Sequence, residues 1–582
     1  MLENQQFMDP TIQEKLSKVF GTQQANQIAG ELESILNSFK GSSAADEWSE
    51  KDILLISYGD QIQSSGRADI QTLHRFLKRH LKGRINGVHL LPFYPYSSDD
   101  GFSVIDYWQV DPKKGTWQDI QQLGLDFNLM FDGVINHISA QSDWFQRFLE
   151  GDPKYRSFFI AKEEDADLSK VVRPRTTPLL TPFHTSEGLK HIWTTFSSDQ
   201  IDLNYSHPPV FLKIVELMLF YIEQGAQLIR LDAIPFLWKK EGTNCMHLEE
   251  THLIVQILRA LLNRVAPGVK IVTEANVPHH ENIEYFGDGT NEAQLVYQFP
   301  LAPLLVHAIN FGSSRHLNQW ADSLKTPSKE TAFFNLTASH DGIGVRPVEN
   351  IISADEMEQL SEQVQKKGGL ISWRTAQGKE RVAYEWNITF FEAIRDPELQ
   401  VEDELNNGRF LTSQAIAMSL AGIPGIYIHN LFGSLNWNEG VKTGSARSIN
   451  RKKFIEQELE DLLHDPTSRE SGIFEAYLHL LGVRTREKSF HPNGAQRIIE
   501  CGDSIFGLLR TSPDRHEQII ALHNLTKLPQ SIHADLQGLV ESNAGTARDL
   551  LSGEEYLIRQ GALSLAMPPF ATIWIKVNRG TL

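Results

Sequence analysis

Apolar residues near the start of the chain recur at the spacing of a helix. Between residue 11 and about residue 40, these positions are Ile28, Leu32, Ile35, Leu36 and Phe39. Apolar residues three and four positions apart fall on one helical face. The pattern predicts a helical extension over residues 1–50 that packs its apolar face against the rest of the protein.

From Ile53 onward, short β-prone apolar runs alternate with stretches long enough to be helices. The eight runs are Ile53–Ser57, Gly87–Leu91, Leu129–Ile135, Gln227–Leu231, Val269–Thr273, Gln294–Tyr297, Ala332–Asn335 and Gly425–Ile428. Eight strands separated by helices are typical of a closed parallel barrel. We therefore predict an α/β fold, a (β/α)8 TIM barrel formed by residues 51–138, 206–343 and 411–490.

Two intervals between these runs are too long for simple connections, and the last part of the chain has a different pattern. Residues 139–205 follow the third strand and residues 344–410 follow the seventh. Long loops after barrel strands lie on the catalytic face, so both are predicted to be inserted subdomains there. Residues 491–582 contain alternating strands such as Ile519–Leu522 and Ala571–Val577, which predict a separate antiparallel β domain.

Composition and charge narrow the classes of function. The chain has 582 residues, 41% of them hydrophobic, and a formal net charge of −18. This charge argues against binding to nucleic acid or to anionic membranes. The two cysteines, Cys245 and Cys501, supply neither a disulfide framework nor a metal-ligand cluster. With no basic and apolar leader at the start, the sequence predicts a cytoplasmic protein that does not span a membrane.

Acidic and basic residues follow four of the predicted strands. They are Asp132 and His137, together with the amide Asn136, at the end of the third strand, Arg230 and Asp232 at the fourth, Glu274 at the fifth, and His340 and Asp341 after the seventh. A single acid at a strand end is usually structural, and Asp132 and Asn136 are expected to hold their loop. The ordered set is more specific, because residues at the C-terminal ends of barrel strands carry out the chemistry.

Two carboxyl groups facing one another can cleave a glycosidic bond with retention of configuration. One attacks the anomeric carbon and the other protonates the leaving oxygen. Arg230 lies two residues before Asp232, so both side chains point to the same face, where the cation would keep Asp232 ionised. Glu274 would stay protonated through desolvation near other carboxylates.

These four segments, together with Gly101–Asp106 after the second strand, resemble the α-amylase superfamily of glycoside hydrolases and transglycosylases. The resemblance extends from about Ile53 to the end. It implies that Asp232 is the nucleophile, Glu274 the acid/base and Asp341 the stabiliser of the transition state. It also implies that His137, Arg230 and His340 hold the glucosyl unit.

Several further runs are similar to the sucrose phosphorylase branch of this superfamily. They are residues 87–95, 98–102, 240–245, 340–344 and 449–451. The resemblance implies that Asp99 and Arg447 bind the far hydroxyls of glucose and limit the site to one sugar. Phe102 and Phe196 would supply apolar walls. A pocket closed after one glucose argues against an amylase.

A phosphorylase also needs cations to hold inorganic phosphate near its carboxylates. Arg173 and Arg175 flank Pro174 in the first insertion, and the branch uses a matching Arg-Pro-Arg for phosphate. Tyr384 in the second insertion matches another phosphate contact. A basic turn on the surface of a lid is the alternative for the two arginines.

The acceptor side departs from sucrose phosphorylase and looks more like the glucosylglycerate phosphorylases. Phe236 stands where sucrose phosphorylase has a tyrosine, and residues 176–183 and 247–249 also differ. The resemblance implies reversible phosphorolysis of 2-O-α-D-glucosyl-D-glycerate to α-D-glucose 1-phosphate and D-glycerate. The glycerate carboxylate needs a cation or donor cluster, for which the sequence offers Arg173, Arg175, Lys239, Lys240 and His247.

Three alternatives stay open from the sequence. They are phosphorolysis of sucrose or sucrose 6'-phosphate, hydrolysis or transglucosylation without phosphate, and a non-catalytic amylase-like subunit. The last is disfavoured because all three carboxylates are present. His279 and His280 lack an evident third ligand, so neither a metal nor a cofactor is predicted. The expected partners are a small glucoside and inorganic phosphate, and the resemblance leaves a homodimer open.

Overall fold

The computed structural model describes residues 8–41, 47–175, 177–375, 381–400, 403–538 and 545–577. Its centre is a closed barrel of eight parallel strands in the order β1-β17-β13-β12-β11-β10-β4-β3. The strands are β1 (Leu54–Ser57), β3 (Gly87–Leu90), β4 (Asn128–Gly133), β10 (Ala226–Leu231), β11 (Lys270–Thr273), β12 (Leu295–Tyr297), β13 (Ala332–Leu336) and β17 (Ile423–Tyr427). The predicted TIM barrel is confirmed.

The barrel strands are apolar and almost entirely buried, because helices cover the outside and side chains fill the inside. The surrounding helices are α3 (Asp69–His80), α4 (Trp117–Gly124), α6 (Pro208–Glu223), α7 (Glu249–Val265), α8 (His279–Asn282), α9 (Leu301–Phe311), α10 (Arg315–Ser323), α13 (Glu404–Ser419), α14 (Asn438–Thr443), α15 (Glu456–His464) and α16 (Arg469–Arg484). Strand β17 begins two residues before the predicted run, because Pro424 is accommodated within it and pairs with Asn335.

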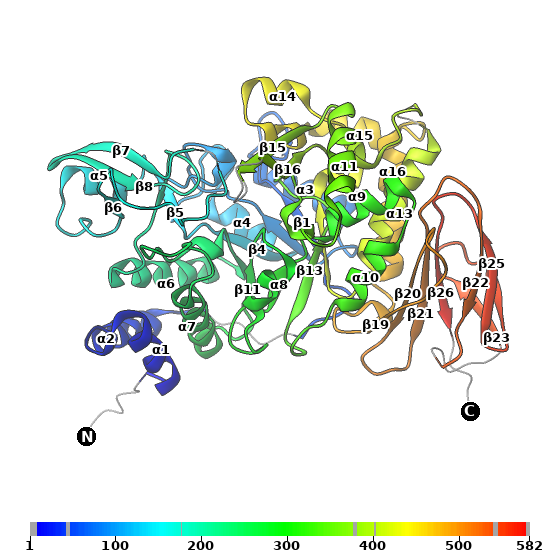
Figure 1. The fold of residues 1–582 in the computed structure, drawn as a ribbon, viewed down its shortest axis with the longest axis horizontal. Helices are drawn as coiled ribbons and strands as arrows, with labels where there is room; N and C mark the ends of the chain where they lie inside the picture. Colours follow the sequence, from blue (N-terminus) through cyan, green and yellow to red (C-terminus); the bar gives the residue numbers. More distant parts are fainter. Residues whose placement is uncertain are drawn as a thin grey trace.

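The N-terminal extension forms two helices that pack beside the barrel (Figure 1). Helices α1 (Pro10–Phe20) and α2 (Thr22–Ser38) are separated by Gly21, whose φ of 81° favours glycine. Their apolar faces are buried, and Glu33 pairs with Arg264 of α7 at 2.7 Å. The extension is therefore part of the main hydrophobic core.

Two sets of short elements interrupt the barrel. After β4 come β5 (His137–Ser139), α5 (Asp143–Glu150), β6 (Ala161–Lys162), β7 (Leu180–Thr185), β8 (Gly188–Trp193) and β9 (Gln200–Asp202). After β13 come β14 (Ile343–Gly344), α11 (Ala354–Lys366), β15 (Leu370–Thr375), β16 (Arg381–Asn387) and α12 (Phe390–Ile394). Strands β6, β8 and β7 form one antiparallel sheet, and β14, β16 and β15 form another. We refer to these as the first and second insertions.

The C-terminal part is an eight-stranded sheet on the opposite side of the barrel from the first insertion (Figure 1). Its strands are β19 (Ala495–Ile498), β20 (Ile505–Thr511), β21 (Gln518–Asn524), β22 (Gln530–Asp535), β23 (Gly545–Asp549), β24 (Glu555–Arg559), β25 (Ala562–Met567) and β26 (Thr572–Val577). The described pairings within it are antiparallel, and it has its own apolar core. Among the described residues, no helix is both long and apolar enough to cross a membrane.

Candidate active site

A pocket at the C-terminal ends of the barrel strands gathers most of the residues singled out from the sequence. Asp232 follows β10 directly, Glu274 follows β11, and Asp341 lies in the loop after β13. The predicted residues that line this pocket are Asp99, Phe102, His137, Arg175, Phe196, Asp232, Glu274, His340, Asp341, Tyr384 and Arg447. Parallel strands bring these distant positions together at one end of the barrel.

Arg230 lies beneath the pocket and links its carboxylates. Its side chain is buried, and Nη1 pairs with Asp132 and, at 3.0 Å, with Oδ1 of Asp232. Nη2 lies 3.9 Å from Oε2 of Glu274. His89 Nε2 contacts the other oxygen of Asp132 at 2.9 Å. Burial raises the pKa of Asp132, but Arg230 and His89 outweigh this and lower that pKa to about 2. Asp132 is thus a fixed anion that orients Arg230.

The two carboxyls expected to carry the chemistry differ in their contact with Arg230. Burial, followed by repulsion from nearby carboxylates, raises the pKa of both Asp232 and Glu274. Such a pair titrates together, so one proton is shared between the two groups. Because Arg230 is nearer to Asp232, the anion is favoured on Asp232 and the proton on Glu274.

Asp341 is held as an anion by two arginines. Nη1 of Arg447 pairs with its Oδ1, and Nη2 of Arg451 lies 3.8 Å from the same oxygen. Although burial opposes ionisation, Arg447 and His340 keep the pKa of Asp341 well below its usual range. Arg447 also makes a two-pronged contact with Glu385 of the second insertion, at 3.1 and 2.7 Å. The predicted donor-subsite arginine therefore connects the second insertion to the barrel.

Two histidines and two phenylalanines form one wall of the pocket. His340 stacks on Phe102 with ring centres 4.6 Å apart, and burial keeps the pKa of His340 well below its usual value. Nε2 of His137 contacts the Phe102 carbonyl at 2.9 Å, and its ring packs against Phe196. Burial also lowers the pKa of His137, so both histidines are neutral near pH 7.

The backbone beside the pocket is held in an uncommon conformation. Asp99, Asp100 and Ala233 have φ values of 52°, 50° and 50°, in the left-handed region that residues with a Cβ rarely occupy. Asp99 faces Nη1 of Arg451 at 3.7 Å, and Ala233 N–H donates to Glu274 at 2.9 Å. Strain of this kind concentrates at functional sites, where surrounding contacts maintain it.

The structure separates the predicted phosphate and acceptor residues. Arg175 and Tyr384 line the pocket, whereas Arg173 is exposed and lies outside its lining. The structure therefore places Arg175, but not Arg173, beside the carboxyl pair, and the phosphate role of Arg173 stays a prediction. Thr176, at the start of the 176–183 segment, lies outside the described residues.

Three of the candidates for the glycerate carboxylate are engaged elsewhere. Lys239 is buried, with Nζ 2.6 Å from Asp202 and 2.7 Å from the Asn136 side-chain oxygen. Lys240 is paired with Glu250 at the surface, and His247 contacts Tyr285 and Glu281. None of these three side chains lines the pocket.

Sequence reasoning missed a guanidinium that does line the pocket. Arg346 lies in the short helix Arg346–Val348, five positions after Asp341, and is largely buried. Its Nη2 is 3.8 Å from Glu281, a separation that leaves much of its hydrogen-bonding capacity available. Gln200 and Asn276 also line the pocket and were not singled out. Arg346 lies two positions after the run 340–344, and extending that run by two residues would have included it.

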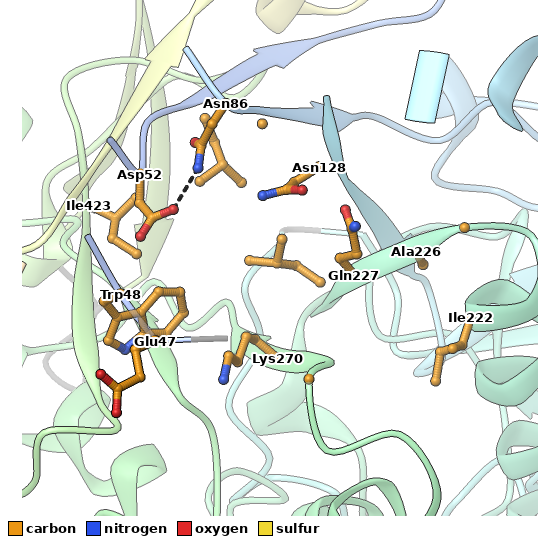
Figure 2. A pocket seen from close by; sticks show the side chains of 15 residues that line it. Glu47, Trp48, Asp52, Asn86, Asn128, Ile222, Ala226, Gln227, Lys270 and Ile423 are labelled. Atoms are coloured by element: carbon orange, nitrogen blue, oxygen red, sulfur yellow. Dashed lines mark hydrogen bonds between the residues drawn. The ribbon is translucent and has the colours of Figure 1, made fainter. Parts of the chain in front are cut away.

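A second pocket lies at the opposite end of the barrel (Figure 2). It is lined by the first residues of six barrel strands: Leu54, Gly87, Asn128, Ala226, Lys270 and Ile423. Figure 2 shows the side-chain amides of Asn86, Asn128 and Gln227 among the residues that line it. Its lining residues include none of the three carboxylates at the C-terminal ends of the strands.

Comparisons with known proteins agree with this geometry. The family model "Alpha amylase, catalytic domain" matches residues 76–342. A glucosylglycerate phosphorylase of Allomeiothermus silvanus is 48% identical over 90% of this chain and 93% of its own. One from Spirochaeta thermophila is 45% identical over 98% of this chain and 100% of its own. The crystal structure of sucrose 6F-phosphate phosphorylase from Thermoanaerobacter thermosaccharolyticum superimposes with a TM-score of 0.72, at 24% identity, over 88% of this chain and 99% of its own.

Proposed function

This chain belongs to the glucosylglycerate phosphorylases of the α-amylase family, and we propose that it catalyses the reversible phosphorolysis of 2-O-α-D-glucosyl-D-glycerate. The products are α-D-glucose 1-phosphate and D-glycerate. The observation that carries this proposal is the presence of Arg175 and Arg346 in the same pocket as the carboxyl pair. Both non-sugar partners of this reaction are anions, and guanidinium groups bind carboxylate and phosphate through paired hydrogen bonds.

The proposed mechanism is a double displacement in two steps. In the first, a carboxylate oxygen of Asp232 attacks the anomeric carbon while Glu274 protonates the departing glycerate oxygen. In the second, hydrogen phosphate attacks the β-glucosyl ester, the carboxylate of Asp232 is released, and the proton of the phosphate returns to Glu274. Two inversions give net retention. The nearer contact of Asp232 with Arg230 supports this assignment, because the nucleophile must be ionised while the acid is protonated.

The donor subsite is proposed to use the neutral histidines and the charged pair at Asp341. His340 would offer a ring nitrogen to a glucose hydroxyl, and Phe102 supplies an apolar surface. A ring nitrogen of His137 would first have to exchange its contact with the Phe102 carbonyl or with the Asn136 amide for a glucose hydroxyl. Arg447 is paired with Asp341 and Glu385, so glucose hydroxyls must share or replace part of that contact. Asp341 would then stabilise positive charge at the anomeric centre in the transition state.

The acceptor subsite is proposed to bind both anions with a small set of residues. Arg175, with Tyr384, would hold phosphate in the second step, as the sequence resemblance implies. Arg346 would hold the glycerate carboxylate in the first step. Phe236 lines the same region and packs edge-on against Phe196, so it offers an apolar surface where a sugar acceptor would need hydrogen bonds. This favours a small charged acceptor over fructose.

A panel of acceptors tests the proposal directly. The chain is incubated with α-D-glucose 1-phosphate and either D-glycerate, fructose, fructose 6-phosphate or no acceptor, and phosphate release is measured. We expect D-glycerate to give the highest kcat/KM. Preference for fructose or fructose 6-phosphate would support a sucrose-type phosphorylase instead. Release without acceptor, or cleavage of the glucoside unchanged by added phosphate, would identify a hydrolase.

A further inference from the structure

Three potential metal ligands from different helices meet on the outside of the barrel, away from the substrate pocket. His307 lies on α9, His316 on α10, and Glu356 in the first turn of α11. One ligand atom from each lies within 4.8 Å of the other two. The residues are separated by up to 49 positions in sequence, so the fold alone brings them together.

We propose that His307, His316 and Glu356 bind a zinc ion. Nε2 of His307 lies 3.1 Å from Oε1 of Glu356, and Nε2 of His316 lies 3.2 Å from the same oxygen. A tetrahedral zinc ion with ligands at about 2.0–2.1 Å separates neighbouring ligand atoms by about 3.3–3.4 Å. The two histidine–carboxylate separations are already close to this value, and the two histidine nitrogens lie within 4.8 Å of each other.

The ligand types and their surroundings also suit this ion. Two imidazole nitrogens and one carboxylate oxygen form a common zinc ligand set, with a fourth position for water. His307 is buried, whereas His316 and Glu356 are partly exposed and give access from solvent. The second oxygen of Glu356 accepts hydrogen bonds from Ser353 N–H at 3.0 Å and from the Ser353 hydroxyl at 2.6 Å. Such supporting contacts orient a ligand before the metal arrives.

The position of the cluster indicates a structural role for the ion. Helix α11 belongs to the second insertion, which also carries Tyr384 and Glu385 on β16. Ser361 of α11 accepts a hydrogen bond from the Trp386 indole at 3.0 Å, so α11 and β16 are joined. A zinc ion would fix the insertion to α9 and α10 of the barrel. This proposal does not depend on the identity of the substrate.

The test measures metal binding by the full-length enzyme. After treatment with a chelator, the protein is titrated with Co²⁺ and then with Zn²⁺. We expect one Co²⁺ per chain, with the visible absorption of a four-coordinate site, and its displacement by Zn²⁺. We also expect saturating Zn²⁺ to raise Tm by at least about 2 °C. No stoichiometric binding at micromolar metal would overturn the proposal and leave the contacts as ordinary hydrogen bonds from two histidines to a carboxylate.

Variants assign the binding to these residues. We expect His316→Ala to weaken Zn²⁺ binding at least about tenfold and to abolish the Tm shift. Glu356→Gln keeps an oxygen that can accept from Ser353 and removes only the charge, so it tests the ligand without removing the helix cap. His280→Ala, an exposed histidine outside the cluster, should bind as the unmodified chain does. Binding that is unchanged in both His316→Ala and Glu356→Gln would contradict the site.

Discussion

The two ends of the barrel use polar side chains for different purposes. At the N-terminal end, polar groups complete the hydrogen bonding of the backbone: the Asn86 side-chain oxygen accepts from Ile53 N–H, and that of Gln227 accepts from Leu129 N–H, both at 3.0 Å. At the C-terminal end, buried carboxylates and guanidiniums face a pocket. The first arrangement satisfies the strand ends, whereas the second keeps charges ready for a substrate.

This difference has a physical cause. Asp52 at the N-terminal end accepts from Ser49 N–H and from the Asn86 amide, both at 2.6 Å, as Figure 2 shows for the second contact. Asp232 and Glu274 at the other end are buried beside each other, and the pKa of both is raised. Hydrogen-bond donors around a carboxylate stabilise its ionised form. Two buried carboxyl groups that share one guanidinium cannot both ionise easily, so one of them retains a proton that it can donate.

The largest expected effect is the loss of the nucleophile. We expect Asp232→Asn to lower kcat by about 10⁴-fold or more, because an amide cannot form the glucosyl ester. Asp52→Asn is the matched control, an equivalent change at the other end of the barrel, and should leave kcat within about twofold. Measurement of kcat for phosphorolysis decides both. Activity retained by Asp232→Asn would refute the catalytic assignment, and a large kcat loss in Asp52→Asn would remove the contrast between the ends.

The next effect depends on the leaving group. We expect Glu274→Gln to lower kcat/KM for glucosylglycerate by about 10²–10⁴-fold, since the departing oxygen then lacks its proton donor. Glucosyl fluoride leaves without such help, so the loss with that substrate should be much smaller. Rates with the two substrates are compared in the same variant. Equal losses for both would contradict the role of Glu274 as the acid.

A smaller effect is expected at the acceptor subsite. Arg346→Ala should raise the KM for D-glycerate by about 10–100-fold in the synthetic direction, the value of a charge-assisted hydrogen bond. The KM for glucose 1-phosphate should change less. Lys240→Ala, which removes a surface cation outside the pocket, is the control. An unchanged KM for D-glycerate in Arg346→Ala would place the carboxylate on another residue, with Arg175 as the first alternative.

The smallest effect is the pH dependence of the unmodified chain. Burial raises the pKa of Glu274, so its proton is present below that pKa and is lost as pH rises through it. We expect kcat/KM to fall about tenfold per pH unit on the alkaline side, beginning well above the ordinary glutamate pKa of about 4.3. This alkaline fall in kcat/KM should be absent from the pH profile of Glu274→Gln measured with glucosyl fluoride. If kcat/KM of the variant still falls at alkaline pH, a group other than Glu274 causes the fall.

The local sequence pattern was sufficient to predict the barrel and the carboxylates at the ends of its strands. Apolar runs mark the strands, and a residue just after a strand of a parallel barrel lies at the catalytic end wherever the loops go. Asp232 and Glu274 were found for this reason. The same reasoning could not place Arg173, Lys239 or His247, because each lies in an irregular segment whose side-chain direction depends on contacts with other parts of the chain.

What the sequence alone determined about this protein is the fold and the residues at the strand ends, through a periodicity that repeats over a few residues. Only the tertiary structure decided which loop residues contact one another or line the same pocket. It turned Arg173 outward, bound Lys239 to Asp202, and brought Arg346 into the pocket. It also brought together His307, His316 and Glu356 from three helices. These contacts join positions far apart in sequence, so no local pattern records them.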